Sequence, residues 1–351
     1  MKEAFFRSRR TTLVHSVLAL MIGVVWVDGQ PARLRDFSKA KSVTLFLPDA
    51  RRGVAEGGLS HAFWERDGRT EVSGFEGMEC RSLSPSNPDA VMGYFYFALD
   101  PTFKEQDVSR VRIDVMYFDG PLGHEGVFGL QYDATGVPNG SSARALLPNV
   151  PFKGSGQWRT NSFHVRDGTF QNSQNARSDF RLWARPAEFS VSRVTVTLEP
   201  EPPALKPLAF NASGEAILGE WHFQPYARTK TVFARTTNQT DGVRSLQIRV
   251  TVGQGGGSWR TAPFLEAGMY RFTARARSTE AARGNVATLR VSGQRLAQSI
   301  RVTPEWTALA YDFSMEAPEH VELVCDFQGT EGGVQFDLDS LKLVQKSKVG
   351  P

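Results

Sequence analysis

Two stretches of the chain repeat one arrangement of residues. Each begins with a tryptophan and places aromatic or apolar residues five and seven positions later, in Trp158–Val165 and Trp306–Phe313. Each lies late in its half of the chain, and a proline-rich segment, residues 199–207, separates the halves. Such a repeat predicts two similar modules in tandem and argues against one large catalytic core.

The first 29 residues have the composition of a secretory signal peptide. Basic residues precede an apolar stretch at 13–27, and Val27 and Gly29 fit a cleavage site. The apolar stretch is about 15 residues long, whereas a membrane-spanning helix needs roughly 20. We therefore expect a secreted or periplasmic protein. The alternative is an uncleaved leader that anchors the chain, which is the one route to a membrane that the sequence offers.

The charge of the chain gives no evidence of nucleic-acid binding, and we expect no nucleic-acid partner. The 351 residues include 41 Lys and Arg against 37 Asp and Glu, and four of these basic residues lie in the leader. Without the leader the chain is nearly neutral, and the sequence has no Lys/Arg cluster that would follow a phosphate backbone. The two cysteines, Cys80 and Cys325, are too few for a zinc site, and we expect buried thiols. A disulfide between the two halves is the alternative.

The pattern of apolar residues predicts an all-β fold of two tandem jelly-roll β-sandwiches. Short alternating runs such as residues 93–99 and 245–252 are bounded by Gly, Pro, Asn and Asp, which is the pattern of strands. The expected organisation is a signal peptide at 1–29, a linker at 30–42, a first sandwich at 43–198, a proline-rich linker at 199–207, a second sandwich at 208–345 and a tail at 346–351. Each sandwich is long enough for its own core.

Four segments of the second half resemble a known group of modules. They are residues 245–248, 265–272, 306–313 and 336–343, in that order. Together they resemble the galactose-binding-like jelly-roll carbohydrate-binding modules of xylanases and related enzymes, over residues 208–345. The resemblance is looser for residues 43–200, where it rests on aromatic segments such as Tyr94–Phe97. It implies glycan binding, with a structural calcium near Asp339, although the second acid of that family's pair is replaced by Ser340.

Sugar binding needs aromatic rings for the apolar face of the sugar and polar groups for its hydroxyls. Trp259 follows three glycines that we expect to form a flexible turn, so it is the strongest candidate for an exposed ring, with Arg260 beside it. A core position is the alternative for every aromatic candidate, and we expect core positions for Trp158 and Trp306. The other candidates are Trp221 and Tyr226 in the second half, and Trp64, Tyr117, Asp119, Tyr132 and Asp133 in the first.

A search for catalytic motifs finds none. The sequence lacks a Gly-x-Ser-x-Gly elbow, a His-Glu-x-x-His helix and a phosphate-binding loop. His164 has no catalytic partner in the sequence, and we expect it to be a strand residue whose hydrogen bonds are satisfied within the protein. We therefore expect a non-catalytic protein that binds a polysaccharide or another glycan, without a cofactor other than the possible calcium. The alternatives are a module that binds another protein, and a carbohydrate-active enzyme whose site residues are scattered. The sequence leaves the oligomeric state open.

Overall fold

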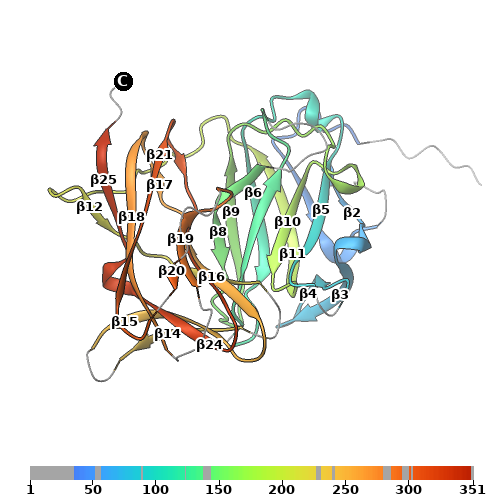
Figure 1. The fold of residues 1–351 in the computed structure, drawn as a ribbon. Coiled ribbons are helices and arrows are strands. Elements are labelled where there is room, and N and C mark those ends of the chain that lie inside the picture. The colour runs from blue at the N-terminus through green and yellow to red at the C-terminus, as the bar shows by residue number, and fades with distance from the viewer. Residues whose placement is uncertain are drawn as a thin grey trace, which may run out of the picture. The chain divides into compact units, whose positions relative to one another are not determined.

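The computed structural model describes residues 35–51, 57–87, 90–122, 124–136, 144–226, 231–238, 242–279, 286–294, 300–301 and 303–348. The expected signal peptide lies outside these residues. Those described form antiparallel strands and short 3-10 turns, without an α-helix among them (Figure 1). In the part of the chain that the structure describes, no helix has the length and apolar character needed to cross a membrane.

The first sandwich consists of two antiparallel sheets. One sheet has the order β3-β4-β11-β6-β9, with β1 also paired to β11, and the other has the order β2-β5-β10-β7-β8. The strands are β1 (Ser42–Phe46), β2 (Leu59–Ala62), β3 (Arg69–Phe75), β4 (Met78–Ser84), β5 (Gly93–Leu99), β6 (Val111–Phe118), β7 (Val127–Tyr132), β8 (Arg144–Pro151), β9 (Trp158–Val165), β10 (Phe180–Arg185) and β11 (Phe189–Leu198).

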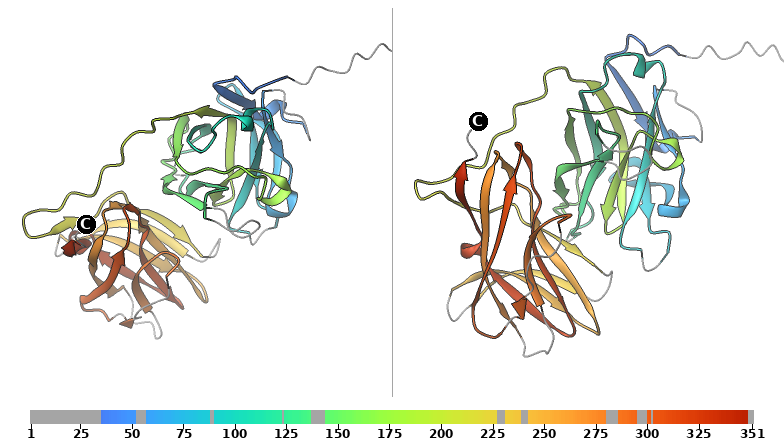
Figure 2. Two further views of the ribbon diagram at one scale, coloured as in Figure 1. Left: turned by 90° about the horizontal axis from the view of Figure 1, so that it is seen from above. Right: turned by 45° about the horizontal axis from the view of Figure 1, so that its top comes forward.

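The second sandwich has sheets of the orders β12-β25-β18-β24-β15-β14, with β21 paired to β18, and β13-β16-β23-β19-β20. Figure 2 shows the orange-to-red strands of this sandwich from two further directions. The strands are β12 (Glu215–Ile217), β13 (His222–Pro225), β14 (Thr231–Thr237), β15 (Arg244–Val250), β16 (Gly255–Thr261), β17 (Phe264–Leu265), β18 (Gly268–Ser278), β19 (Val286–Val291), β20 (Ile300–Arg301), β21 (Thr307–Met315), β22 (Glu319–His320), β23 (Leu323–Gly329), β24 (Gly332–Asp337) and β25 (Lys342–Lys348).

The two sandwiches share one strand order. In the first, β4-β11-β6-β9 and β5-β10-β7-β8 form the two sheets, and in the second β15-β24-β18-β21 and β16-β23-β19-β20 do so. This is the jelly-roll arrangement, so the predicted all-β jelly-roll fold is confirmed. The repeated tryptophan stretches fall on β9 and β21, which occupy equivalent edge positions. The sequence repeat therefore reflects a repeat in the fold.

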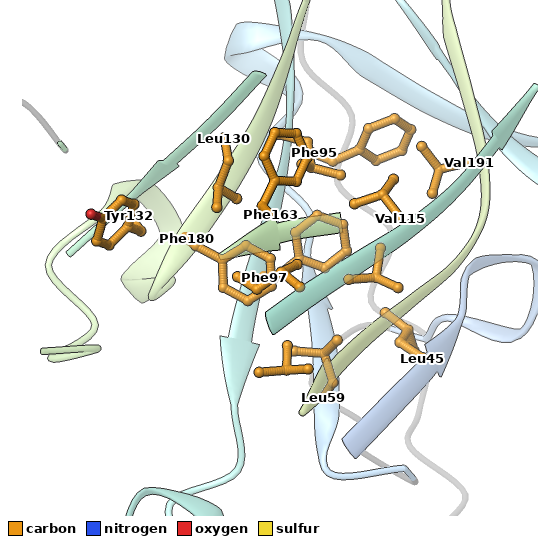
Figure 3. Packing of buried hydrophobic residues seen from close by; sticks show 14 of the residues in the cluster. Leu45, Leu59, Phe95, Phe97, Val115, Leu130, Tyr132, Phe163, Phe180 and Val191 are labelled. Atoms are coloured by element: carbon orange, nitrogen blue, oxygen red, sulfur yellow. The ribbon is translucent and has the colours of Figure 1, made fainter. Parts of the chain in front are cut away.

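Each sandwich has its own cluster of buried side chains. The first cluster takes residues from Val43 to Val196 and the second from Leu218 to Leu343, and they have no member in common. Figure 3 shows Phe95, Phe97 and Phe180 gathered in the first cluster, with Tyr132 at its side. These clusters form because alternate residues of each strand point to the same side of the sheet. Both cysteines are buried free thiols, as expected.

The repeated tryptophans themselves do not lie in these cores. Trp158 is half-buried on the outer side of β9, where its ring packs on Phe118 and its Nε1 donates to the carbonyl of Phe75 at 3.0 Å. Trp306 is half-buried as well, and the guanidinium carbon of Arg277 lies 4.4 Å from its ring centroid. The expectation of core positions is wrong for both. Each precedes the alternating core residues of its strand by an odd number of positions, and so faces the other way.

Candidate functional site

Four of the predicted sugar-binding aromatics are core residues. Trp221 and Trp259 are 4% and 3% exposed and belong to the second cluster, and Tyr117 and Tyr132 belong to the first. The polar atoms of both tryptophans are satisfied inside the protein, since Trp259 Nε1 donates to the carbonyl of Gln247 at 3.1 Å and Trp221 Nε1 to that of Leu218 at 3.2 Å. These four predictions are therefore wrong, and the alternative of a core position holds.

The prediction for Trp259 failed because the glycines before it form a strand. Gly255–Thr261 is β16, which pairs with β13 on one side and β23 on the other. Glycine is needed there for close packing: a Cβ atom on Gly256 would lie 2.4 Å from the Phe327 carbonyl oxygen, and one on Gly257 would lie 2.4 Å from the Phe233 ring. The absence of side chains on these glycines lets neighbouring groups approach the strand closely. Trp259 on the same strand packs against Phe223 and Phe233.

Asp119, predicted to contact a sugar, instead fixes a loop. It is fully buried and accepts hydrogen bonds from the Lys153 backbone N–H at 2.8 Å and the Ser155 hydroxyl at 2.6 Å. Arg159 Nε lies 3.0 Å from its Oδ2. Because its oxygens are already used inside the protein, Asp119 holds the segment before β9 in place.

Asp133 has the same role beside the neighbouring loop. It is 3% exposed and accepts from the backbone N–H groups of Gln171 and Ser173, at 3.0 and 2.9 Å, and from Gln174 Nε2 at 2.5 Å. A buried carboxylate with this many donors is a structural anchor. The prediction that Asp133 contacts a ligand is wrong for the same reason as for Asp119.

An internal ammonium group occupies the oxygen-rich corner next to this loop. Lys104 Nζ lies 3.1 Å from the Phe170 carbonyl oxygen, 2.7 Å from Asn172 Oδ1, and 3.1 and 3.2 Å from the two carboxylate oxygens of Asp179. Asp179 is fully buried. This set of oxygens resembles what a bound metal cation would need. Here the positive charge comes from the chain itself.

Asp339, the predicted calcium ligand, is turned toward solvent. It lies in the 3-10 turn η5 (Leu338–Ser340) between β24 and β25, and its side chain is 61% exposed and paired with Arg244 at 2.5 Å. Its neighbour Asp337 is buried and forms an ion pair with Arg275. Within the described ranges, no three His, Cys, Asp or Glu residues are grouped closely enough to hold a metal ion. The charge of Asp339 is thus paired with that of Arg244.

Three predicted residues do lie outside the cores. Arg260 follows Trp259 on β16 and points to the opposite side of the sheet, but it is 8% exposed, and its Nη1 lies 2.5 Å from Oε2 of the buried Glu322, so the prediction that it contacts a ligand is wrong. Tyr226 is half-buried just after β13, and its hydroxyl accepts from Arg290 Nη2 at 3.2 Å. Trp64 is half-buried just before the 3-10 turn η2 (Glu65–Asp67), with the guanidinium carbon of Arg66 5.2 Å from its ring centroid. Arg260 and Tyr226 share the outer face of the second sandwich, whereas Trp64 belongs to the first.

A group of residues that sequence reasoning missed covers the outer face of sheet β2-β5-β10-β7-β8. Phe95, Phe97, Phe180, Leu182 and Leu130 belong to the core cluster, so the residues between them on the same strands face outward. These residues form a grid on three adjacent strands, in which Tyr96 and Trp183 are buried, at 1% and 6% exposed, and the others are half-buried. We call the following five residues the aromatic face: Tyr94 and Tyr96 on β5, Arg181 and Trp183 on β10, and Gln131 on β7.

The strand register aligns these side chains in two rows. Arg181 lies opposite Tyr96 on one side and opposite Gln131 on the other. Trp183 lies opposite Tyr94 on one side and Gly129 on the other. Gly129 makes room for the indole, because a Cβ atom there would lie 2.8 Å from Trp183 Nε1. The face therefore combines three aromatic rings with a guanidinium and an amide.

Arg181 is held flat against the tyrosines. Its guanidinium carbon lies 4.7 Å from the Tyr94 ring centroid and 5.9 Å from that of Tyr96, and Nε donates to Gln131 Oε1 at 2.6 Å. The two tyrosine rings stack with centroids 5.8 Å apart and planes 27° apart. This packing fixes Arg181 by a cation–π contact and one hydrogen bond before any ligand binds.

A polar edge adjoins the aromatic face at Tyr96. The Tyr96 hydroxyl donates to Asp67 Oδ2 at 2.6 Å, and Asn175 Nδ2 donates to the same oxygen at 2.9 Å. Burial, and then the bond to Asp67, raise the pKa of Tyr96, and burial raises the pKa of Tyr94. Both phenols are therefore protonated at neutral pH, as suits hydrogen-bond donors and not general bases.

Two buried polar atoms beside Gly129 have no hydrogen-bond partner within the described residues. They are Trp183 Nε1 and, on β8, Asn149 Oδ1. Both adjoin Gly129, since a Cβ atom on that glycine would lie 2.6 Å from Asn149 Oδ1 and 2.8 Å from Trp183 Nε1. A buried donor or acceptor left unpaired costs about 1–3 kcal/mol. Both atoms are shielded from solvent, so a ligand on the surface of the sheet does not reach them.

The sequence did contain a signal for this face. Tyr94–Phe97 alternates tyrosine with phenylalanine, and Phe180–Trp183 alternates apolar residues with Arg181 and the tryptophan. Once the phenylalanines are assigned to the core, the period of two places Tyr94, Tyr96 and Arg181 together on the other side. That the two runs lie on adjacent strands was not evident, because about 80 residues separate them.

Comparison with known proteins gives similarity to solved structures alone. No protein-family model matches the chain, and no curated protein matches it. A CBM61 module solved in complex with β-1,4-galactotriose is 13% identical, with a TM-score of 0.28 over 36% of this chain and 89% of that one. The CBM22-1 xylan-binding domain of Paenibacillus barcinonensis Xyn10C is 15% identical, with a TM-score of 0.29 over 42% of this chain and 99% of that one.

An enzyme is also among these structures. The isomalto-dextranase of Arthrobacter globiformis T6, solved in complex with panose, is 13% identical, with a TM-score of 0.25 over 75% of this chain and 36% of that one. The similar structures thus include carbohydrate-binding modules and an enzyme. Similarities this low do not assign a function.

Proposed function

We propose that the chain is a non-catalytic glycan-binding protein and that a sugar binds on the aromatic face. The observation that carries the proposal is the half-buried group of Tyr94, Arg181 and Gln131 on three adjacent strands, backed by the buried rings of Tyr96 and Trp183. Aromatic rings meet the C–H face of a sugar, and the guanidinium and amide meet its hydroxyl groups.

A glycan array followed by titration with soluble oligosaccharides tests this proposal. We expect binding, and we expect Tyr94→Ala to weaken it about fivefold, because an aromatic contact contributes on the order of 1 kcal/mol. Phe46→Ala is the matched control. Phe46 is an exposed aromatic on β1, in the other sheet of the same sandwich, and it too lies under a guanidinium, that of Arg193. Its removal is expected to leave binding unchanged.

Two other results would replace the proposal. Absence of binding across a broad panel of neutral and acidic oligosaccharides favours a protein partner for this face. Depolymerisation of a polysaccharide favours an enzyme with a scattered site. In either case the Tyr94→Ala variant shows whether the aromatic face is involved. The activity depends on Tyr94 only if this face takes part in it.

We also propose that the protein is exported, as a secreted or periplasmic protein. The basic residues, the short apolar stretch and the small residues near Gly29 support this proposal. N-terminal sequencing of exported protein is expected to begin at Gln30 or within a few residues of it. Recovery of the intact leader in a membrane fraction would support the anchored alternative.

A further inference from the structure

The aromatic face carries a guanidinium that no carboxylate neutralises. Within the described part of the chain, Arg181 forms no ion pair, and its one hydrogen bond goes from Nε to the neutral amide of Gln131. The nearby carboxylate, Asp67, already accepts from Tyr96 and Asn175 through the same oxygen. The terminal N–H groups of Arg181 are therefore available to donate hydrogen bonds to a ligand.

The surroundings of Tyr94 also favour a negative ligand. The charges of Arg181 and Arg185 both lower the pKa of Tyr94, and Asp67 raises it, while burial determines the net direction. Arg185 follows Trp183 on β10 by two positions and so lies on the same side of the strand, and its Nε is buried without a partner. At Tyr94, two guanidinium charges are thus opposed by one carboxylate, although Arg185 also lies near Glu322 and donates to the Pro225 carbonyl at 3.0 Å.

We propose that the aromatic face binds acidic glycans and that Arg181 receives the carboxylate of a uronic acid residue. A planar guanidinium offers parallel N–H groups that match the two oxygens of a carboxylate. Stacking on Tyr94 and the bond to Gln131 hold the guanidinium in place beforehand, so little side-chain freedom is lost on binding. The sugar ring that bears the carboxylate then lies beside the half-buried Tyr94. This inference rests on the proposed function and adds the class of glycan.

The test compares acidic oligosaccharides with the same oligosaccharides after reduction of their carboxylates to alcohols. Oligogalacturonate and a glucuronate-substituted xylo-oligosaccharide are the probes, with affinity measured by titration at low and high salt. We expect the acidic form to bind about tenfold more tightly or better, since hydrogen bonds to a charged group are the strong ones. We also expect this preference to shrink as salt rises.

Variants of Arg181 locate the effect. Arg181→Gln is expected to abolish the preference for the acidic form, and Arg181→Lys to retain only part of it, because lysine keeps the charge and loses the planar pair of donors. Arg193→Gln, which removes the guanidinium above Phe46 on the other sheet, is the control and is expected to leave the preference intact. The unfolding temperature of each variant shows that it is folded.

The outcomes separate the two proposals. Equal affinity for the acidic and reduced forms overturns the uronate inference and leaves glycan binding in place. A preference that survives in folded Arg181→Gln overturns the assignment to Arg181. Failure of the wild type to bind any oligosaccharide, acidic or neutral, overturns the proposed function itself.

Discussion

Trp259 and Arg260 are neighbours on β16, and their side chains lie on opposite sides of the sheet. The indole packs against Phe223 and Phe233 in the core, whereas the guanidinium of Arg260 forms a buried pair with Glu322 on the other side of the sheet. The sequence predicted both residues to belong to one binding site. Adjacent residues of a strand point to opposite sides of the sheet, so at most one of the two could have faced a ligand.

The core position of Trp259 predicts a large loss of stability on truncation. Trp259→Ala is expected to lower the free energy of unfolding by about 3–5 kcal/mol, because it removes a buried indole and leaves a cavity. Chemical denaturation monitored by circular dichroism measures the change. Met269→Ala is the control, since Met269 is 49% exposed on β18 and its truncation is expected to be nearly neutral. A folded Trp259→Ala variant with wild-type stability would contradict the core assignment.

The architecture was predictable because it depends on patterns that extend over many residues. Alternation in runs such as β5 and β15, with glycine and proline between them, gave the strands, and the repeat in β9 and β21 gave the two modules. Each pattern is supported by many side chains at once. One misassigned residue, such as Trp158, therefore did not alter the predicted fold.

The site was harder to predict, because it depends on the direction of single side chains. Asp119 and Asp133 have the chemistry of sugar ligands, but backbone N–H groups of distant loops use their oxygens. Nothing local in the sequence reveals those partners. The aromatic face, conversely, requires that β5 and β10 be adjacent, and this pairing joins residues about 80 positions apart.

The glycines of β16 predict a second stability effect. Gly256→Ala is expected to destabilise the protein by about 1–3 kcal/mol, because the new Cβ would collide with the Phe327 carbonyl of the paired strand β23. Gly219→Ala is the matched control, since no atom lies within 4 Å of a Cβ placed there. Thermal unfolding of the two variants tests this. If both unfold at the wild-type temperature, the strand assignment of these glycines is wrong.

Limited proteolysis tests the predicted domain boundaries. Residues 199–214 contain no strand, and the two core clusters on either side share no residue. We expect cleavage near residues 199–208 and two stable fragments, each rich in β-structure by circular dichroism. Mass spectrometry of the fragments locates the cut. A single resistant fragment would mean that the two halves do not behave as separate domains.

Calcium is expected to add little to stability. The charge of Asp339 is paired with Arg244, and the ammonium of Lys104 already lies among the oxygens near Asp179. Thermal unfolding in calcium and in a chelator is therefore expected to give the same midpoint. A clear rise of the midpoint with calcium, abolished in Asp339→Asn, would instead support the structural calcium that the family resemblance implies.

The pair of Lys104 and Asp179 predicts a loss of stability that depends on pH. Burial raises the pKa of Asp179 to about 6, and the charge of Lys104 limits this rise. Because the folded-state pKa exceeds the value of 3.8 that applies without burial, the folded protein holds this proton more strongly, and its stability falls as pH rises through this window. The ionised carboxylate needs the ammonium most above pH 6.

Lys104→Met is therefore expected to cost about 3–5 kcal/mol near pH 7.5, where it leaves a buried carboxylate unpaired, and much less near pH 4, where Asp179 is protonated. Denaturation at both pH values measures the difference. The double variant Lys104→Met/Asp179→Asn removes the charge itself, so its stability loss is expected to be similar at both pH values. A loss in Lys104→Met that is equal at pH 4 and pH 7.5 would show that the lysine contributes by packing and not by its charge.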